Sequence, residues 1–344
     1  MANRALGVHP LPESQTILKP ALAVDSEEGV RLLGNAGNGV IGDRIFYFSM
    51  LSCGLCVLAV VGLIVYELVT KSSNSWHASG IRFFFRSEWD PVNENFGALP
   101  FVYGTIVSSL LALALAVPLA IGVAIFITEM CPRWLKGALA FTTELLAAIP
   151  SVIYGLWAIF VMVPLLREYV EPWLARYFGW TGLFEGAPYG IGMLAAGIIL
   201  AVMVIPIVSS ITREVMTAVP QQQREAVLAL GATRWEMIRT GVLRNARAGI
   251  LGAIILGLGR ALGETMAVTM VVGNRPEIAK SLFAPGYTMA SVIANEFSEA
   301  TSDRYLSALV EVGLALFILT IVVNIMAQFL VWTVTRGTPA RANV

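Results

Sequence analysis

Charge is the scarcest property of this 344-residue sequence. Only 13% of its residues are Asp, Glu, Lys or Arg, against roughly a quarter in soluble globular domains. That scarcity excludes a soluble enzyme and a highly charged disordered chain. The 23 basic and 23 acidic residues balance, so no net field attracts nucleic acid. Cysteine is also rare: the three cysteines lie in or beside apolar runs, and no disulfide framework is expected.

Apolar residues are what the sequence has in excess, at 57% of the chain. A helix needs about 20 of them in a row to cross the hydrocarbon core of a bilayer. Six stretches are long enough, at residues 45–69, 101–128, 138–164, 189–211, 248–273 and 305–333. The sequence therefore predicts an all-α integral membrane protein with six transmembrane helices.

The positions of lysine and arginine predict how the spans are oriented. Most of them fall in the segment before the first span, in the second and fourth loops, and after the last span. Loops rich in Lys and Arg stay in the cytoplasm, so both termini are predicted to be cytoplasmic. We divide the chain into a flexible N-terminal tail (1–43), a first span with a long outer loop (44–100), a core of five spans (101–334) and a C-terminal tail (335–344).

The fourth loop, residues 213–247, has a helix–glycine–helix pattern. Pro220 suits the first turn of a helix, and Gly231 can adopt the left-handed conformation that ends one. Thr233 and Glu236 then have the spacing of a capping box, which begins a second helix. We predict two helices lying flat under the membrane and hinged at Gly231.

This loop resembles the EAA loop of importer-type ABC permeases, the segment that docks in a groove of the ATPase subunit. Four residues match the family's pattern: Glu225, Ala226, Gly231 and Leu243. Three positions depart from it: Val227 replaces alanine, Gly241 replaces isoleucine and Arg244 replaces proline. The resemblance implies that Glu225, Ala226 and Gly231 couple the ATPase to the spans.

Further segments resemble the phosphate-specific permeases of the PstC type: 87–92, 96–100, 148–155, 257–265, 281–286 and 290–297. The resemblance covers roughly residues 81–333. It implies the six-helix fold of type I ABC importer permeases, in the cell inner membrane. It also implies a heterodimer with a related A-type permease, two ATP-binding subunits and an extracytoplasmic phosphate-binding protein. We expect the first outer loop, with its acidic Glu88, Asp90 and Glu94, to face that binding protein.

The chain itself carries no sign of catalysis. A phosphate-cradling P-loop needs a Gly-Lys step, and no lysine in the sequence follows a glycine. No Ser/His or paired-Asp constellation stands out either. We expect no catalytic residue, cofactor or metal, and we assign ATP hydrolysis to partner subunits.

One arginine lies inside an apolar run. Arg260 is near the middle of the predicted fifth span, and Glu264 follows at i+4, on the same helical face. An ionised side chain at bilayer depth is costly unless it faces a partner or a wet cavity. Two interpretations stay open: an internal ion pair that orients helices, or a substrate site in which the Arg260 guanidinium binds phosphate and Glu264 partly neutralises it.

Three functions are compatible with these features. A permease for phosphate import is favoured, and a permease of the same architecture for another oxyanion, such as molybdate or sulfate, is the alternative. An ion-coupled secondary transporter is a third, but it should show an internal repeat and needs no docking loop.

Overall fold

The computed structural model describes residues 36–335, and it contains no regular strand within that range. It divides into two units between Ile64 and Val65, each described here by itself. Helix α2 (Ala36–Lys71) begins in the first unit and ends in the second. Residues 1–35 of the predicted N-terminal tail and 336–344 of the predicted C-terminal tail lie outside the described residues.

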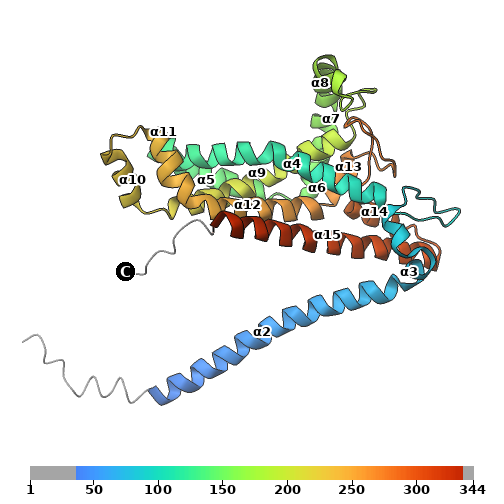
Figure 1. The fold of residues 1–344 in the computed structure, drawn as a ribbon, viewed down its shortest axis with the longest axis horizontal. Helices are drawn as coiled ribbons and strands as arrows, with labels where there is room; N and C mark the ends of the chain where they lie inside the picture. Colours follow the sequence, from blue (N-terminus) through green and yellow to red (C-terminus); the bar gives the residue numbers. More distant parts are fainter. Residues whose placement is uncertain (1–35, 336–344) are drawn as a thin grey trace, which may run out of the picture. The chain divides into compact units, whose positions relative to one another are not determined.

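The second unit is built from helices (Figure 1), and its longest links are residues 86–98, 182–192 and 272–288. In chain order these are α3 (Ser73–Ser79), η1 (Gly80–Phe85), α4 (Leu99–Ile125), η2 (Phe126–Met130), α5 (Arg133–Ala148), α6 (Ser151–Trp157), η3 (Ala158–Met162), α7 (Val163–Leu165), η4 (Leu166–Val170), α8 (Glu171–Phe178), η5 (Gly179–Thr181), α9 (Met193–Thr217), α10 (Gln221–Ala229), α11 (Arg234–Glu236), η6 (Met237–Leu243), α12 (Arg244–Gly263), α13 (Met266–Val271), α14 (Met289–Glu296) and α15 (Asp303–Thr335).

Within residues 36–335, six helical stretches are long and apolar enough to cross a membrane, which confirms the predicted number. They are Gly42–Lys71, Leu99–Met130, Ser151–Thr181, Met193–Thr217, Arg234–Gly263 and Asp303–Thr333. The first, second, fourth and sixth agree closely with the sequence prediction. The third and fifth are displaced along the chain.

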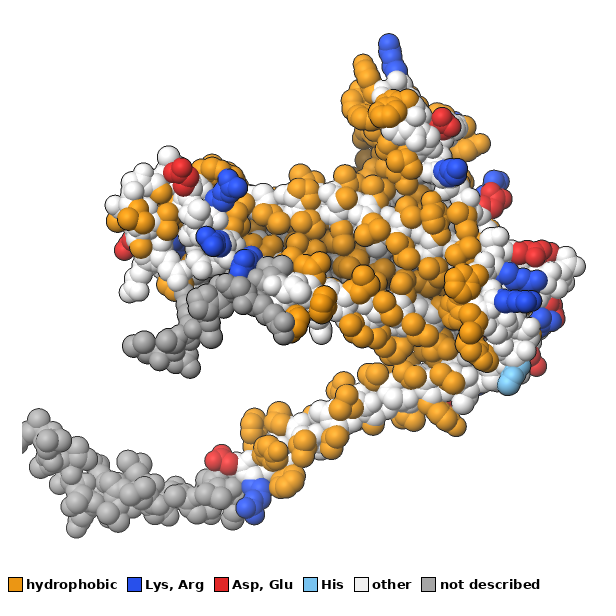
Figure 2. Space-filling view, viewed as in Figure 1, with side chains coloured by type: hydrophobic (Ala, Val, Ile, Leu, Met, Phe, Trp, Pro, Cys, Tyr) orange, Lys and Arg blue, Asp and Glu red, His pale blue; other side chains and the backbone are white. Residues whose placement is uncertain are grey.

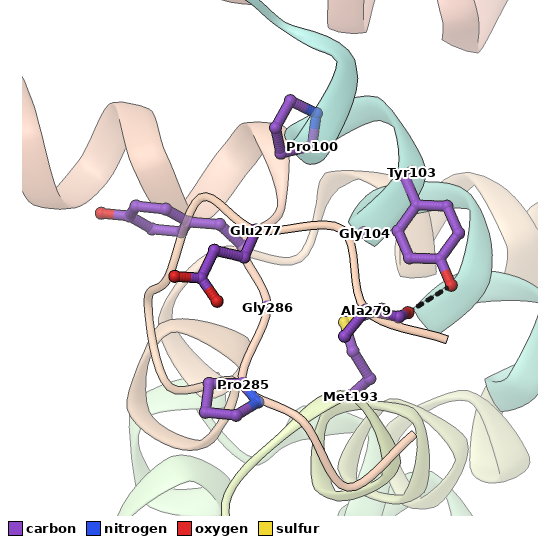
Figure 3. Close-up of a pocket in the computed structure, with 9 residues that line it drawn as sticks. Pro100, Tyr103, Gly104, Met193, Glu277, Ala279, Pro285 and Gly286 are labelled. Atoms are coloured by element: carbon purple, nitrogen blue, oxygen red, sulfur yellow. Dashed lines mark hydrogen bonds between the residues drawn. The ribbon is translucent and has the colours of Figure 1, made fainter. Parts of the chain in front are cut away.

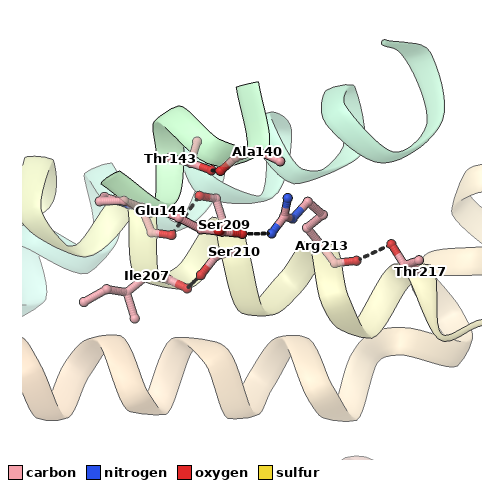
Figure 4. A network of polar contacts seen from close by, with 9 residues as sticks. Ala140, Thr143, Glu144, Ile207, Ser209, Ser210, Arg213 and Thr217 are labelled. Carbon is pink, nitrogen blue, oxygen red and sulfur yellow. Dashed lines mark hydrogen bonds and ion pairs between the residues drawn. The ribbon is translucent and has the colours of Figure 1, made fainter. Parts of the chain in front are cut away.

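The third span starts later than predicted because Pro150 separates it from α5. A proline has no N–H for the helix ladder, and it disfavours helical geometry in the residue before it. Ile149 accordingly has φ −66° and ψ 131°, and the span begins at Ser151. Helix α5 is a separate element, joined to α9 by an ion pair between Glu144 and Arg213 (Figure 4).

Helix α9 is the central element, since α4 and α12 both pack along it and it is the most buried of the spans. Small side chains allow this close approach. Ala112, Ala116 and Ala120 of α4 are fully buried at a four-residue spacing. A Cβ added to Gly197 of α9 would lie 2.5 Å from Cδ2 of Leu111. The core therefore packs α4 and α12 closely against α9.

The surface of this bundle is apolar around its middle, with charged side chains gathered toward its two ends (Figure 2). Leu110, Phe160 and Phe329 are among the large apolar side chains that stay more than half exposed. Contiguous apolar surface of this extent is unstable in water and matches the hydrocarbon interior of a bilayer.

The end of the bundle that carries α14, here called the α14 end, has an aromatic core of its own. Trp89, Phe96, Phe101 and Tyr305 pack together there. Glu296 of α14 accepts hydrogen bonds from Trp89 Nε1 at 2.8 Å and from the Tyr305 hydroxyl at 2.6 Å. Helix α14 therefore anchors loop 86–98 through Trp89.

Candidate functional site

Helix α10 projects at the opposite end of the bundle, here called the α10 end (Figure 1). It begins directly after Pro220 and is followed by a turn at Gly231, where φ is +83°. The left-handed conformation predicted for Gly231 is confirmed. A Cβ at this position would meet nothing within 4 Å, so the backbone conformation, rather than crowding, requires glycine here.

The predicted capping box is present, but the helix that it begins is not a separate one. The Glu236 N–H donates to Thr233 Oγ1 at 3.3 Å, and Glu236 Oε2 accepts from the Thr233 N–H at 2.8 Å. From there α11 continues through η6 into α12 as one span, Arg234–Gly263. The prediction of two flat helices is therefore wrong for the second, which is the first turn of the fifth span.

The exposed side of α10 combines polar and apolar groups. Glu225 and Ala226 are exposed, and Gln221 Nε2 donates to Glu225 Oε1 at 3.0 Å. Leu230 is 88% exposed, and Trp235 on α11 is also exposed. Large apolar side chains in a charged surface are typical of a protein contact, so the α10 end has the chemistry of a docking surface.

Two of the positions that depart from the EAA pattern lie against each other. A Cβ on Gly241 of η6 would lie 3.3 Å from Val227 Cγ2 and 3.7 Å from the Gln223 carbonyl oxygen, both on α10. The pattern has alanine and isoleucine at positions 227 and 241, whereas this chain has the larger residue on α10 and the smaller on the span. The two departures compensate in volume and keep α10 packed on η6.

Arg260 and Glu264 are not placed as the sequence predicted. Helix α12 ends at Gly263, and Glu264 is extended, with φ −70° and ψ 127°. Arg260 therefore lies in the last turn of its span, not in the middle, and Glu264 lies beyond the helix. Among the residues that the structure describes, Arg260 forms no ion pair. Glu264 Oε1 instead accepts from the Ala267 N–H, at 3.4 Å, where α13 begins.

Arg260 lies on a face of α12 that the other described residues leave open. Cβ atoms added to Gly252, Gly259 or Gly263 would meet nothing within 4 Å, and Leu256 is 60% exposed. These positions follow one another at intervals of three to four residues, so they form one stripe along the helix. Nearer the α10 end the face borders an apolar groove of about 650 Å³ between α9, α12 and α15. Nothing within residues 36–335 packs against Gly252, Gly259 or Gly263 at this distance.

A second, smaller pocket lies at the α14 end (Figure 3). It is lined by residues of α4, α9 and loop 272–288, and the Tyr103 hydroxyl donates to the Ala279 carbonyl at 2.9 Å. A Cβ on Gly104 would run into the Tyr287 carbonyl oxygen. The pocket therefore lies within the contact that holds loop 272–288 against α4.

Loop 86–98 contains an ordered turn at Asp90. Asp90 Oδ1 accepts from the N–H groups of Val92 at 2.9 Å and Asn93 at 3.2 Å. Hydrogen bonds from the Asn93 side chain and backbone and from Val92 hold the pKa of Asp90 below its ordinary value. Val92 at the tip is 90% exposed, and Glu94 lies 3.6 Å from Arg304.

Comparison with known proteins gives a consistent result. Residues 116–336 match the family described as binding-protein-dependent transport system inner membrane component. The chain is 44% identical over 302 residues to the phosphate transport system permease protein PstC of Mesorhizobium japonicum, covering 87% of this chain and 92% of that one. It is 39% identical over 324 residues to PstC 2 of Mycobacterium tuberculosis, covering 92% and 97%. A chain of the inward-facing MetNI methionine ABC transporter has a TM-score of 0.53 at 18% identity, covering 68% of this chain and 94% of that one, which shows a shared fold.

Proposed function

Because the chain belongs to the family of binding-protein-dependent transport system inner membrane components, which are transport permeases and not enzymes, we propose that it is the permease subunit of an ATP-driven importer for inorganic phosphate. The observation that supports phosphate as the substrate is the 44% identity to a phosphate permease over most of both chains. The six apolar spans make it a multi-pass protein of the cell inner membrane.

The chain works with partners that supply energy and substrate. A related permease completes the translocation path, two ATP-binding subunits hydrolyse ATP, and an extracytoplasmic protein delivers phosphate. The exposed Glu225, Ala226 and Leu230 around the Gly231 turn support ATPase docking at the α10 end. That end faces the cytoplasm, as its arginines favour, and the α14 end with Asp90 faces outward.

Arg260 is the substrate-contacting residue of this proposal. A guanidinium on an open face, with no carboxylate paired to it, has its donors available to a phosphate oxygen. The glycines beside it leave room for an anion and its water. Glu264, just past the helix end, moderates the positive field so that phosphate is released, because a conducting site must bind weakly enough to empty.

Reconstitution tests this function. The purified complex in liposomes, with the binding protein and ATP, should accumulate radiolabelled phosphate, and excess sulfate or molybdate should compete poorly. Transport that prefers sulfate or molybdate would identify that oxyanion as the substrate instead of phosphate. Uptake that follows an ion gradient without ATP would assign a secondary transporter.

A further inference from the structure

Arg224 lies on α10 between two spans and contacts both of them. Its Nη2 atom donates to the Met216 carbonyl oxygen at 2.8 Å, in the last turn of α9. The same nitrogen lies 3.2 Å from Glu129 Oε1 in η2, the continuation of α4. One guanidinium therefore joins the helix of the docking surface to the ends of two neighbouring spans.

These contacts are largely shielded from water. The side chains of Arg224 and Glu129 are 20% and 10% exposed, and Met216 is fully buried. Among the described residues, Glu129 has no other cationic partner. An ion pair this enclosed is weakly screened, and removing one partner leaves the other charge uncompensated. The contact with Glu129 is a charge contact, because Glu129 Oε1 accepts no hydrogen bond from the described residues, whereas the Met216 carbonyl does accept one from Arg224.

The backbone changes its winding where α10 is attached. Both η2 and η6 are π-helical, and the Cys131 N–H donates back to the Phe126 carbonyl at 2.8 Å. Single π turns inside α-helices often occur at functional sites. Besides Arg224, α10 is held by its packing of Val227 over Gly241 and by the links at residues 218–220 and 230–233. Those links can bend, whereas the guanidinium ties α10 directly to α4 and α9.

We propose that Arg224 is a positioning residue that makes α10, the end of α4 and the end of α9 move as one body. A displacement of α10 then reaches both spans instead of being absorbed in the links. This inference rests on the proposed function, in which an ATPase subunit moves α10. It assigns Arg224 and Glu129 no contact with phosphate.

Transport per ATP hydrolysed tests the inference. Arg224→Gln and Glu129→Gln should assemble with the ATPase and still hydrolyse ATP, but move about tenfold less phosphate per ATP, within the usual range of coupling between sites. The double variant should be no worse than Arg224→Gln alone, because that change already removes the contact with Glu129. Arg133→Gln, which removes an exposed arginine four residues after Glu129, is the matched control and should transport normally.

A distance measurement separates this role from a purely structural one. Spin labels are placed at Gln222 on α10 and at Met130 at the end of η2, in a background with Cys53, Cys56 and Cys131 replaced. Both positions are exposed. The distance between them should stay constant on ATP addition in the parent and change in Arg224→Gln. A change in the parent, or additive losses in the double variant, would overturn the inference. A constant distance in a complex that transports no phosphate would reject the proposed function but not the positioning role of Arg224.

Discussion

Replacing Gly231 by valine should loosen the turn after α10 without any steric clash. The residue has φ +83°, and an added Cβ meets nothing within 4 Å, so the whole penalty is that of a left-handed conformation. For an L-residue that penalty is about 1–2 kcal/mol, and a β-branched side chain is the least tolerant of it. This corresponds to a factor of about 5–30 toward conformations in which the turn has opened.

Asparagine and alanine substitutions provide the comparison. Gly231→Asn should lose less, because asparagine tolerates the left-handed region. Gly122→Ala changes an exposed glycine inside α4 with open space around it, and should gain up to about 1 kcal/mol in helix propensity. The assay is amide hydrogen exchange of residues 228–233 in the assembled complex, together with co-purified ATPase and phosphate uptake. Equal exchange and equal uptake for valine, asparagine and glycine would refute the reasoning.

Three further outcomes follow from the geometry. Gly241→Ala should lose stability to overpacking against Val227, by about 1–3 kcal/mol before any helix-propensity gain, and Val227→Ala in the same chain should recover it. Thermal unfolding of the parent, the two single variants and the double variant measures the coupling, and strict additivity would contradict the contact. Because the pKa of Asp90 is lowered, the stability that its carboxylate adds to the turn at residues 90–93 should be complete above pH 3.8 and be lost as the pH falls through the lowered value. Asp90→Asn should show faster amide exchange in that turn already at neutral pH, and unchanged protection in that variant would contradict this role of Asp90. A photo-crosslinker at Val92 should capture the phosphate-binding protein without disturbing the Asp90 turn, and labelling from the cytoplasmic side alone would reverse the orientation.

Periodicity and composition were sufficient for the elements whose signal is local. The apolar runs gave the number of spans, and the left-handed Gly231 and the Thr233 capping box followed from residue type. The sequence did not predict where one helix ends and where another continues. The apolar pattern runs through Pro150, and it does not reveal that α11 continues into α12.

The prediction that Arg260 and Glu264 share one helical face was wrong for the same reason. An i+4 spacing puts two residues on one face only if the helix continues, and here it ends at Gly263. The Arg224–Glu129 contact was beyond sequence reasoning, because it joins residues that are 95 positions apart and depends on how α4 and α9 pack. Local chemistry could be predicted from the sequence, whereas contacts between spans required the fold.

The central claim is that phosphate crosses beside Arg260, and uptake by an Arg260→Gln complex tests it most directly. The variant and its control, Arg176→Gln on the third span, should both assemble with the ATPase in liposomes. We expect ATP-dependent phosphate uptake to be abolished in the first and retained in the second. Because no ion pair with Glu264 is formed, adding Glu264→Gln should not restore it. Normal uptake by Arg260→Gln, or recovery in the double variant, would contradict the account.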